Sequence, residues 1–288
     1  MTILTISSQV LFGHVGNSVA DFALRRLGFE VVAVPTVILS NHKGYPDAVG
    51  EATPPALLRD QFEALGRRGV LDRLSAVQTG FFASPAQAKT VFDLLGALRS
   101  SKPDLPIIID PVMGDKGRLY VETGLVELFQ NAAPGLASLI TPNAFEAETL
   151  AGCPVSGLED LRSQLQAIGF SAGLVTSAEA MAPDISGRGV LCFDAAETTL
   201  VEHRGVVFER EPNGVGDFIA ALSTGLYAPG QGLPQRTARI CAALVRLLER
   251  TQALGLGELA LVQAQADWTT ALDQADVAPG TITRVTKA

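Results

Sequence analysis

Short apolar runs alternate with longer amphipathic segments along most of this 288-residue chain, and this alternation limits the available folds more than any other feature. Apolar residues recur at helical spacing in residues 17–27, 54–68, 86–98, 144–150 and 158–169. Strand-like runs separate them at residues 2–6, 29–34, 75–79, 106–109, 136–140 and 173–176. Such alternation predicts an α/β fold with a central, mainly parallel sheet and helices on both faces.

The last third of the chain departs from this alternation. Residues 189–193, 198–203 and 206–209 form three strand-like runs with no helix between them, which predicts an antiparallel edge of the sheet. Residues 217–254 and 259–272 predict three further helices. Neither a linker nor an internal repeat interrupts the chain, so we expect a single domain over residues 1–288.

The composition favours a globular enzyme that acts on small molecules. Hydrophobic residues make up 47% of the chain and charged residues 18%, which excludes a disordered protein. A formal net charge of −8 argues against nucleic acid as a partner, because proteins that bind it usually present a basic face.

The amino-terminal residues and the cysteines bear on location. Residues 1–6 lack a basic leader and a long apolar segment, so we expect neither export nor a membrane partner. Cys153, Cys192 and Cys241 are odd in number and widely spaced, which indicates a reducing compartment, without disulfides or a zinc site. We therefore expect a cytoplasmic protein.

Residues 213–217, which read Asn-Gly-Val-Gly-Asp, precede an apolar helical run. Gly214 and Gly216 allow the backbone to approach a ligand closely, and the following helix presents its N-terminus to an anion, so a phosphate site is predicted. Asp217 would repel the phosphate itself and is better suited to hold or deprotonate an incoming hydroxyl, which favours phosphoryl transfer to an alcohol. Alternatively, Asp217 is only the N-terminal cap of a buried helix.

Polar residues also follow the central predicted strands. Asp110 and Asp115 lie on one turn after residues 106–109, and carboxylate oxygens there suit Mg²⁺ bound to nucleotide phosphates. The element Thr-Pro-Asn-Ala-Phe-Glu begins at Thr141, and its Asn143 and Glu146 either cap the next helix or hold a hydrated magnesium ion. Ligands of open parallel sheets bind beyond the carboxyl ends of the strands, where all these residues are expected.

Taken together, these segments resemble the pyridoxal kinases of the ribokinase-like superfamily. Residues 8–18 (Ser-Gln-Val-Leu-Phe-Gly-His-Val-Gly-Asn-Ser) resemble their amino-terminal signature, and residues 40–45 (Ser-Asn-His-Lys-Gly-Tyr) their substrate-covering loop, which we place at about 35–52. Residues 110–121 and 141–148 resemble their metal, nucleotide and Thr-Pro-Asn-x-x-Glu elements. The resemblance runs nearly end to end and implies a three-layer ribokinase-like fold.

The resemblance also implies a role for each matching residue. Ser8 would bind the pyridine ring, Asp217 would take the proton of the 5′-hydroxymethyl group, and Gly214, Val215 and Gly216 would form the anion hole. The Mg²⁺·ATP side would comprise Asp110, Asp115, Tyr120, Thr141, Asn143, Glu146, Thr176, Ser177, Gly214 and Gly216. Asp110 and Glu146 would hold the metal through water, K⁺ is a further candidate cofactor, and a homodimer is implied.

Two positions depart from the family pattern. Lys43 and Gly44 stand where many of these kinases have a threonine in the covering loop, so Lys43 is either solvated, directed to the phosphates or able to form a Schiff base with pyridoxal. Val215 replaces a frequent threonine, which changes little if the anion hole consists of backbone N–H groups. His42 and Phe81 are candidates for contact with the ring.

The expected activity is ATP-dependent phosphorylation of pyridoxal, with pyridoxine and pyridoxamine as further candidates, to give pyridoxal 5′-phosphate. A hydroxymethylpyrimidine kinase of the same superfamily remains an alternative within enzymes. A vitamin B6-binding protein that has kept the fold and lost phosphoryl transfer is the alternative outside them.

Overall fold

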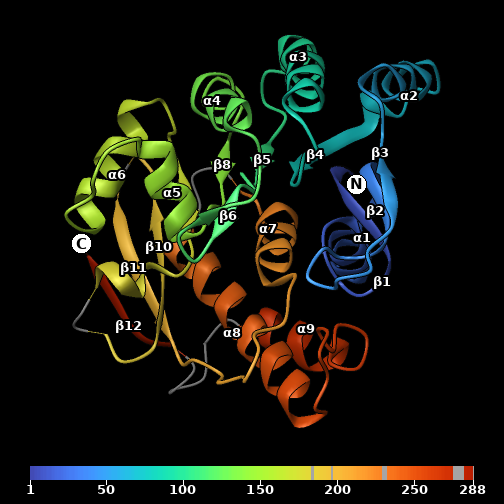
Figure 1. Cartoon of the computed structure of the whole chain (residues 1–288). Coiled ribbons are helices and arrows are strands. Elements are labelled where there is room, and N and C mark those ends of the chain that lie inside the picture. Colours follow the sequence, from blue (N-terminus) through green and yellow to red (C-terminus); the bar gives the residue numbers. More distant parts are fainter. Residues whose placement is uncertain (183–184, 196, 229–231, 275–281, 288) are drawn as a thin grey trace.

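A ten-stranded sheet organises the computed structural model, which describes residues 1–182, 185–195, 197–228, 232–274 and 282–287. The strands lie in the order β12-β11-β10-β9-β8-β5-β4-β1-β2-β3, with the blue amino-terminal strands at one end (Figure 1). Their bounds are β1 Thr2–Phe12, β2 Glu30–Asn41, β3 Gly50–Ala52, β4 Leu74–Thr79, β5 Ile107–Ile109, β8 Leu139–Ile140, β9 Gly173–Val175, β10 Arg188–Phe193, β11 Thr198–His203 and β12 Ile282–Lys287.

The six central strands of this sheet are parallel, and both of its edges are antiparallel. Parallel pairing runs from β9 through β8, β5, β4 and β1 to β2. At one end, β3 pairs antiparallel with β2. At the other end, β10 pairs antiparallel with β9, β11 with β10 and β12 with β11. The predicted mainly parallel sheet with an antiparallel edge is confirmed.

Helices cover both faces of the sheet and complete three layers. Helices α1 (Asn17–Arg26), α7 (Val215–Gly225), α8 (Leu233–Ala253) and α9 (Gln265–Asp273) pack on one face. Helices α2 (Pro55–Arg67), α3 (Pro85–Ser101), α4 (Thr123–Asn131), α5 (Ala144–Ala151) and α6 (Leu158–Ala167) pack on the other. The sequence analysis missed α4.

Strand β5 shows why this arrangement is stable. Ile107 and Ile109 are fully buried under α2 to α6, and Ile108 is fully buried under the helices of the opposite face. Successive side chains of a strand point to opposite faces, and burial of each isoleucine contributes roughly 1.5–3 kcal/mol. An uninterrupted apolar run is therefore required where both faces are covered.

The prediction that the first strand spans only residues 2–6 is wrong. Strand β1 continues to Phe12, and its register against β2 shifts between Ser7 and Ser8. Strand β2 supplies backbone hydrogen-bond partners along this continuation, whereas pairing with β4 ends at Ile6, and this tertiary context overrides the low strand propensity of two serines. Ser8 thus lies within the strand at an irregularity, and does not follow it.

The expected substrate-covering loop at about residues 35–52 is partly a hairpin. Strand β2 extends through Asn41 and pairs with β3, where Leu39 lies opposite Gly50. Residues 42–49 form the connecting turn, which we call the covering turn. Backbone pairing therefore anchors both ends of this segment.

The third strand predicted for the antiparallel edge, at residues 206–209, is also wrong. Residues 206–209 are not a strand, and the Val207 side chain is 82% exposed. Strand β12, from the end of the chain, pairs with β11 instead, with Val201 opposite Val285. A partner about eighty residues away leaves no local signal, because strand pairing depends on tertiary position. Residues 114–119 form a further hairpin of β6 (Gly114–Asp115) and β7 (Arg118–Leu119), which was not predicted.

Within the described part of the chain, every helix is too short or too polar to cross a membrane.

Candidate active site

The carboxyl ends of β5, β8 and β9 lie side by side and carry three of the predicted nucleotide-side residues. Asp110 follows β5, Thr141 follows β8 and Thr176 follows β9. Backbone hydrogen bonds extend the pairing past each strand, from Asp110 N to Thr79 O (3.0 Å), Thr141 N to Ile109 O (3.1 Å) and Thr176 N to Pro142 O (2.9 Å). Ser177, next to Thr176, has a left-handed backbone (φ 56°) and precedes a short 3-10 helix.

The Gly-Val-Gly segment begins helix α7. Gly214 is the N-terminal cap, with φ 87°, and a Cβ atom there would lie 2.0 Å from the carbonyl oxygen of His14. A Cβ at Gly216 would meet only open space. The first turn therefore presents its free N–H groups to an open region, as an anion site requires.

Asp217 lies in the first turn of α7 and does not cap it. Gly214 occupies the cap position, and its cap carries no side-chain hydrogen bond, so the capping alternative is wrong. Burial raises the pKa of the Asp217 carboxyl, and a hydrogen bond from the backbone N–H of Gly16 opposes that shift. The loop after β1 therefore contacts the aspartate directly.

Asp110 and Glu146 are buried close to Asp217. Burial raises the pKa of Asp110, and the charges of Glu146 and Asp217 raise it further. Burial also raises the pKa of Glu146 to about 7. Mutual repulsion of this kind shows a concentration of negative charge, which a cation would relieve.

Glu146 and Asn143 form the cap of helix α5 that the sequence analysis weighed. Asn143 Oδ1 accepts from Glu146 N, and Glu146 Oε2 accepts from Asn143 N, both at 2.9 Å. Glu146 Oε1 accepts from the backbone N–H groups of Met113 (2.8 Å) and Gly114 (3.3 Å), and Asn143 Nδ2 donates to Gly114 O (2.8 Å). This element therefore fastens the segment after Asp110 to α5.

The same residues fit a hydrated magnesium ion. Among the described residues, no three His, Cys, Asp or Glu side chains are arranged to ligate a metal together. Mg²⁺ usually keeps several waters and takes one or two carboxylates in addition to substrate phosphates. The buried carboxylates of Asp110 and Glu146 match that requirement, with the open region before α7 available for phosphates.

Two further predicted residues lie in the β6–β7 hairpin or directly after it. Asp115 is exposed, and its Oδ1 accepts from Lys116 N (2.8 Å). Tyr120 is 54% exposed. Lys116 Nζ and Arg188 Nη2 both lie 2.7 Å from the carboxylate of Glu211, which ties this hairpin to the segment before the anion site. The sequence analysis singled out neither Glu211 nor Arg188, because surface charges carry no motif.

Residues predicted to bind the substrate ring lie beside the loop after β1. Ser8 is buried, and a Cβ at Gly16 would lie 2.3 Å from Ser8 Oγ, so the two residues are in close contact. Phe81 is partly buried and packs on a small cluster of Val10, Val37 and Leu39. This cluster is separate from the two main cores.

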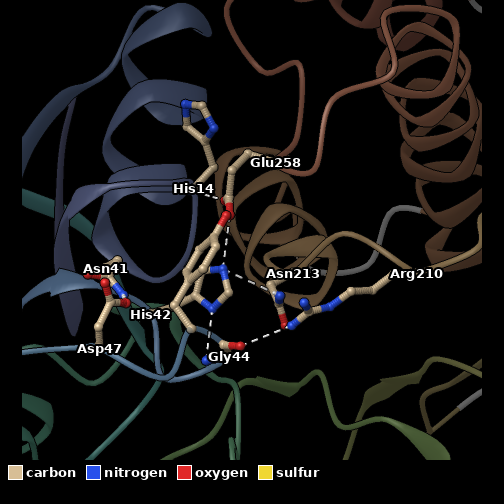
Figure 2. Close-up of polar contacts among 9 residues, drawn as sticks. His14, Asn41, His42, Gly44, Asp47, Arg210, Asn213 and Glu258 are labelled. Atoms are coloured by element: carbon tan, nitrogen blue, oxygen red, sulfur yellow. Dashed lines mark hydrogen bonds and ion pairs between the residues drawn. The ribbon is translucent and has the colours of Figure 1, made fainter.

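The covering turn is held against the loop after β1 by Glu258, as Figure 2 shows. Glu258 Oε1 lies 2.9 Å from His42 Nε2 and accepts from Tyr45 Oη (2.8 Å), while Oε2 accepts from His14 N (3.0 Å). His42 is buried, whereas Lys43 and Gly44 are exposed. Glu258 was missed, because it is 216 positions from His42 and belongs to no motif.

A second contact to the covering turn comes from the segment that leads into α7. Arg210 Nη2 donates to the carbonyl oxygen of Gly44 (3.0 Å), and Asn213 Nδ2 lies 3.5 Å from His42 Nε2. The turn thus contacts both sides of the site: the loop after β1 and the segment before α7.

Comparison with known proteins places these features in a family. The family model described as phosphomethylpyrimidine kinase matches residues 23–257. A pyridoxine/pyridoxal/pyridoxamine kinase of Bordetella pertussis is 36% identical over 265 residues, which cover 90% of this chain and 92% of the relative. The pyridoxal kinase PdxY of Rubrobacter xylanophilus is 35% identical over 268 residues, with 92% of both chains covered.

Solved structures agree with the fold. Pyridoxal kinase from Entamoeba histolytica superposes with a TM-score of 0.86 at 22% identity, covering 100% of this chain and 99% of that one. Pyridoxal kinase from Leishmania donovani in complex with ADP and pyridoxamine superposes with a TM-score of 0.81 at 26% identity, with the same coverage. The predicted ribokinase-like fold is confirmed.

Proposed function

The chain belongs to the pyridoxal kinase family, and from that membership we propose that it phosphorylates the 5′-hydroxymethyl group of pyridoxal with ATP. The products are pyridoxal 5′-phosphate and ADP. The relative from Bordetella pertussis is named for pyridoxine, pyridoxal and pyridoxamine, and one Leishmania donovani structure holds ADP together with pyridoxamine. The observation in this chain that carries the proposal is Asp217, partly buried in the first turn of a helix whose N-terminus opens onto free space.

Asp217 orients the substrate hydroxyl and accepts its proton as the oxygen attacks the γ-phosphorus of ATP. The bond between the γ-phosphorus and the bridging oxygen breaks, and ADP leaves. A carboxylate is a weak base for an alcohol, but in a loose transition state the nucleophile needs orientation more than early deprotonation. The N–H groups of Gly214, Val215 and Gly216 stabilise charge on the transferred group.

The nucleotide side comprises Asp110, Asp115, Tyr120, Thr141, Asn143, Glu146, Thr176 and Ser177. Asp110 and Glu146 hold Mg²⁺ through water, and the ion supplies charge neutralisation at the phosphates when it is bound. We also propose that the phosphorylation reaction requires K⁺.

On the substrate side, Ser8 binds the pyridine ring, Phe81 contacts its face, and His42 lies in the turn that covers it. Lys43 and Gly44 complete the turn. The exposed Lys43 is within the segment that would enclose pyridoxal, so its amine is a candidate to form a Schiff base with the aldehyde. Borohydride trapping with pyridoxal tests this role. Absence of an adduct on Lys43 excludes that role.

We further propose that the chain acts as one domain and forms a homodimer in the cytoplasm. Large apolar side chains are exposed along the β1–β3 edge, namely Leu11 (80%), Phe12 (62%), Ile38 (47%) and Val49 (73%). An apolar group of this kind beside an edge strand supports association with a second copy. The three free cysteines, Cys153, Cys192 and Cys241, support a reducing compartment.

The deciding experiment is phosphorylation of pyridoxal, pyridoxine, pyridoxamine and hydroxymethylpyrimidine by the purified protein with ATP and Mg²⁺, with and without K⁺. Product from pyridoxal supports the proposal. Product from hydroxymethylpyrimidine alone would favour the alternative kinase. Binding of pyridoxal without any product would favour the non-catalytic binding protein.

The variant Asp217→Asn tests the mechanism within the same assay. We expect turnover to fall by roughly 10²- to 10⁴-fold, the range for a positioned acid or base. Asp267→Asn, at an exposed position of α9, is the matched control and should retain full turnover. Near-normal turnover by a folded Asp217→Asn protein would exclude the proposed base.

A further inference from the structure

Glu258 makes three hydrogen bonds that join two segments distant in sequence. Its Oε1 contacts His42 Nε2 and Tyr45 Oη in the covering turn, and its Oε2 accepts from the backbone N–H of His14. Gly44 N donates to His42 Nδ1 (3.1 Å), and this assigns the ring proton to Nε2, which therefore donates to Glu258. Both carboxylate oxygens are thus used as acceptors.

The surroundings of Glu258 favour a charged, fixed carboxylate. Its side chain is 13% exposed. Burial opposes ionisation, yet the hydrogen bonds from His14, Tyr45 and His42 together hold the pKa of Glu258 below its ordinary value. Hydrogen bonds to a charged acceptor are stronger than those between neutral groups, so this arrangement resists opening.

The loop that Glu258 holds reaches the reacting groups. The His14 carbonyl lies against Gly214, where a Cβ atom would be only 2.0 Å away, so the loop packs directly on the start of the anion site. Two residues further along, Gly16 donates its N–H to Asp217. A displacement of the loop at His14 would therefore disturb both the anion site and the orientation of Asp217.

We infer that Glu258 is a positioning residue that couples closure of the covering turn to the alignment of Asp217. The inference rests on the proposed function for its kinetic consequence, but the structural coupling does not depend on which alcohol is phosphorylated. One carboxylate oxygen fixes the turn, and the other fixes the loop that contacts Asp217. Glu258 itself touches neither substrate nor nucleotide in this assignment.

Two variants separate the two halves of this coupling. Tyr45→Phe removes one hydrogen bond from the turn and leaves the contact to His14 intact. Glu258→Gln keeps the size of the side chain but replaces one acceptor oxygen by an amide NH₂. Depending on how the amide is turned, the variant loses either the contact to His14 or a contact to the covering turn. Glu249→Gln, the same substitution on α8 beyond these contacts, is the matched control.

Trypsin cleavage after Lys43 measures closure of the turn without reference to activity. Lys43 is exposed within the covering turn, and cleavage there requires the turn to open. We expect the cleavage rate, followed by mass spectrometry, to rise roughly 10-fold in Glu258→Gln and severalfold in Tyr45→Phe. Glu249→Gln should be cleaved at the rate of the unsubstituted protein.

Steady-state kinetics measure the effect on the reaction. Both variants should raise KM for pyridoxal, by roughly 10-fold in Glu258→Gln, while KM for ATP changes by less than about twofold. Only Glu258→Gln should also lower kcat, because only it breaks the link between the turn and the loop that contacts Asp217, whichever way the amide is turned. Thermal unfolding of each variant checks that the fold is retained.

Unchanged cleavage after Lys43 in both variants would overturn the inference, whatever the kinetics. A fall in kcat of equal size in Tyr45→Phe and Glu258→Gln would overturn the division into two halves. If Glu258→Gln fails to fold, Tyr45→Phe still decides whether the turn is held by this carboxylate. A protein without kinase activity that nonetheless shows faster cleavage in both variants would contradict the proposed function alone.

Discussion

At the scale of single residues, the site depends on carboxylates whose surroundings differ. Asp217 is partly buried in the first turn of α7, Asp110 and Glu146 are buried together beyond the sheet, and Glu258 is surrounded by hydrogen-bond donors. Burial favours the protonated form of the first three, whereas the donors favour the ionised form of Glu258. In the proposed function, the same chemical group therefore serves as base, cation site and structural acceptor.

The raised pKa of Asp217 predicts the acid limb of the pH profile. The proposed base acts in its ionised form, so kcat/KM is lost as the pH falls through the folded-state pKa. Because burial raises that pKa, the limb should lie above the value of ~3.9 for an unperturbed aspartate. The measurement is kcat/KM for pyridoxal against pH, and the residual activity of Asp217→Asn should lack this limb. A limb near the unperturbed value, or one retained in the variant, contradicts the assignment.

At the scale of elements, the ends of helices build the site. Helix α7 supplies free N–H groups behind Gly214, and α5 is fastened by Asn143 and Glu146 to the segment after β5. Helix N-termini leave N–H groups without intrahelical partners, so one end is left open for an anion and the other is closed by side chains.

The two glycines at the start of α7 should respond differently to substitution by alanine. Gly214→Ala places a Cβ atom against the His14 carbonyl in a left-handed backbone, and we expect it to lower the free energy of unfolding by about 2 kcal/mol or more. Gly216→Ala should leave that free energy within about 1 kcal/mol and lower kcat/KM for ATP, because its methyl group enters the open region. Chemical denaturation and steady-state kinetics check both. Equal losses of stability would contradict this distinction.

The cap of α5 should matter for the nucleotide as well as for stability. Asn143→Ala removes the hydrogen bonds to Glu146 N and Gly114 O, and we expect a loss of about 1–2 kcal/mol together with a severalfold higher KM for ATP. Ser84→Ala removes the corresponding side-chain cap of α3 and should cost stability without changing that KM. If the two variants change KM for ATP alike, the cap of α5 has no particular role at the nucleotide side.

At the scale of the whole molecule, the sheet has edges of different character. At the β3 end, strands β1 and β2 expose a group of apolar side chains. At the other end, β12 covers β11. The edge at β3 offers an apolar surface suited to a second copy.

The proposed homodimer predicts a specific effect of surface substitutions. We expect Leu11→Ser combined with Val49→Ser to convert the dimer to a monomer, because both side chains are largely exposed in the single chain. Sedimentation velocity over a range of concentrations measures this. Leu254→Ser, at an exposed apolar position that caps the C-terminus of α8, should leave the dimer intact. A dimer that survives the double substitution places its interface elsewhere.

Local periodicity was sufficient to predict the central strands and most helices. The run at residues 106–109 is apolar throughout because β5 is covered on both faces, and helices such as α2 show the spacing of a half-buried surface. The order of strands and helices also predicted that Asp110, Thr141 and Thr176 lie together at the carboxyl ends of neighbouring parallel strands. In an alternating α/β chain, the connectivity alone brings the carboxyl ends of the parallel strands to the same side of the sheet.

Features that depend on distant partners were beyond the sequence. The continuation of β1 past Ser8, the pairing of β12 with β11 and the contacts of Glu258 all join residues far apart in the chain. A strand edge or a carboxylate acquires its role from what packs against it, and neighbouring residues do not encode that partner. The sequence by itself therefore determined the α/β class, the family resemblance and the candidate residues. Only the tertiary structure decided how the covering turn is held over the site, because that depends on contacts between segments brought together by folding.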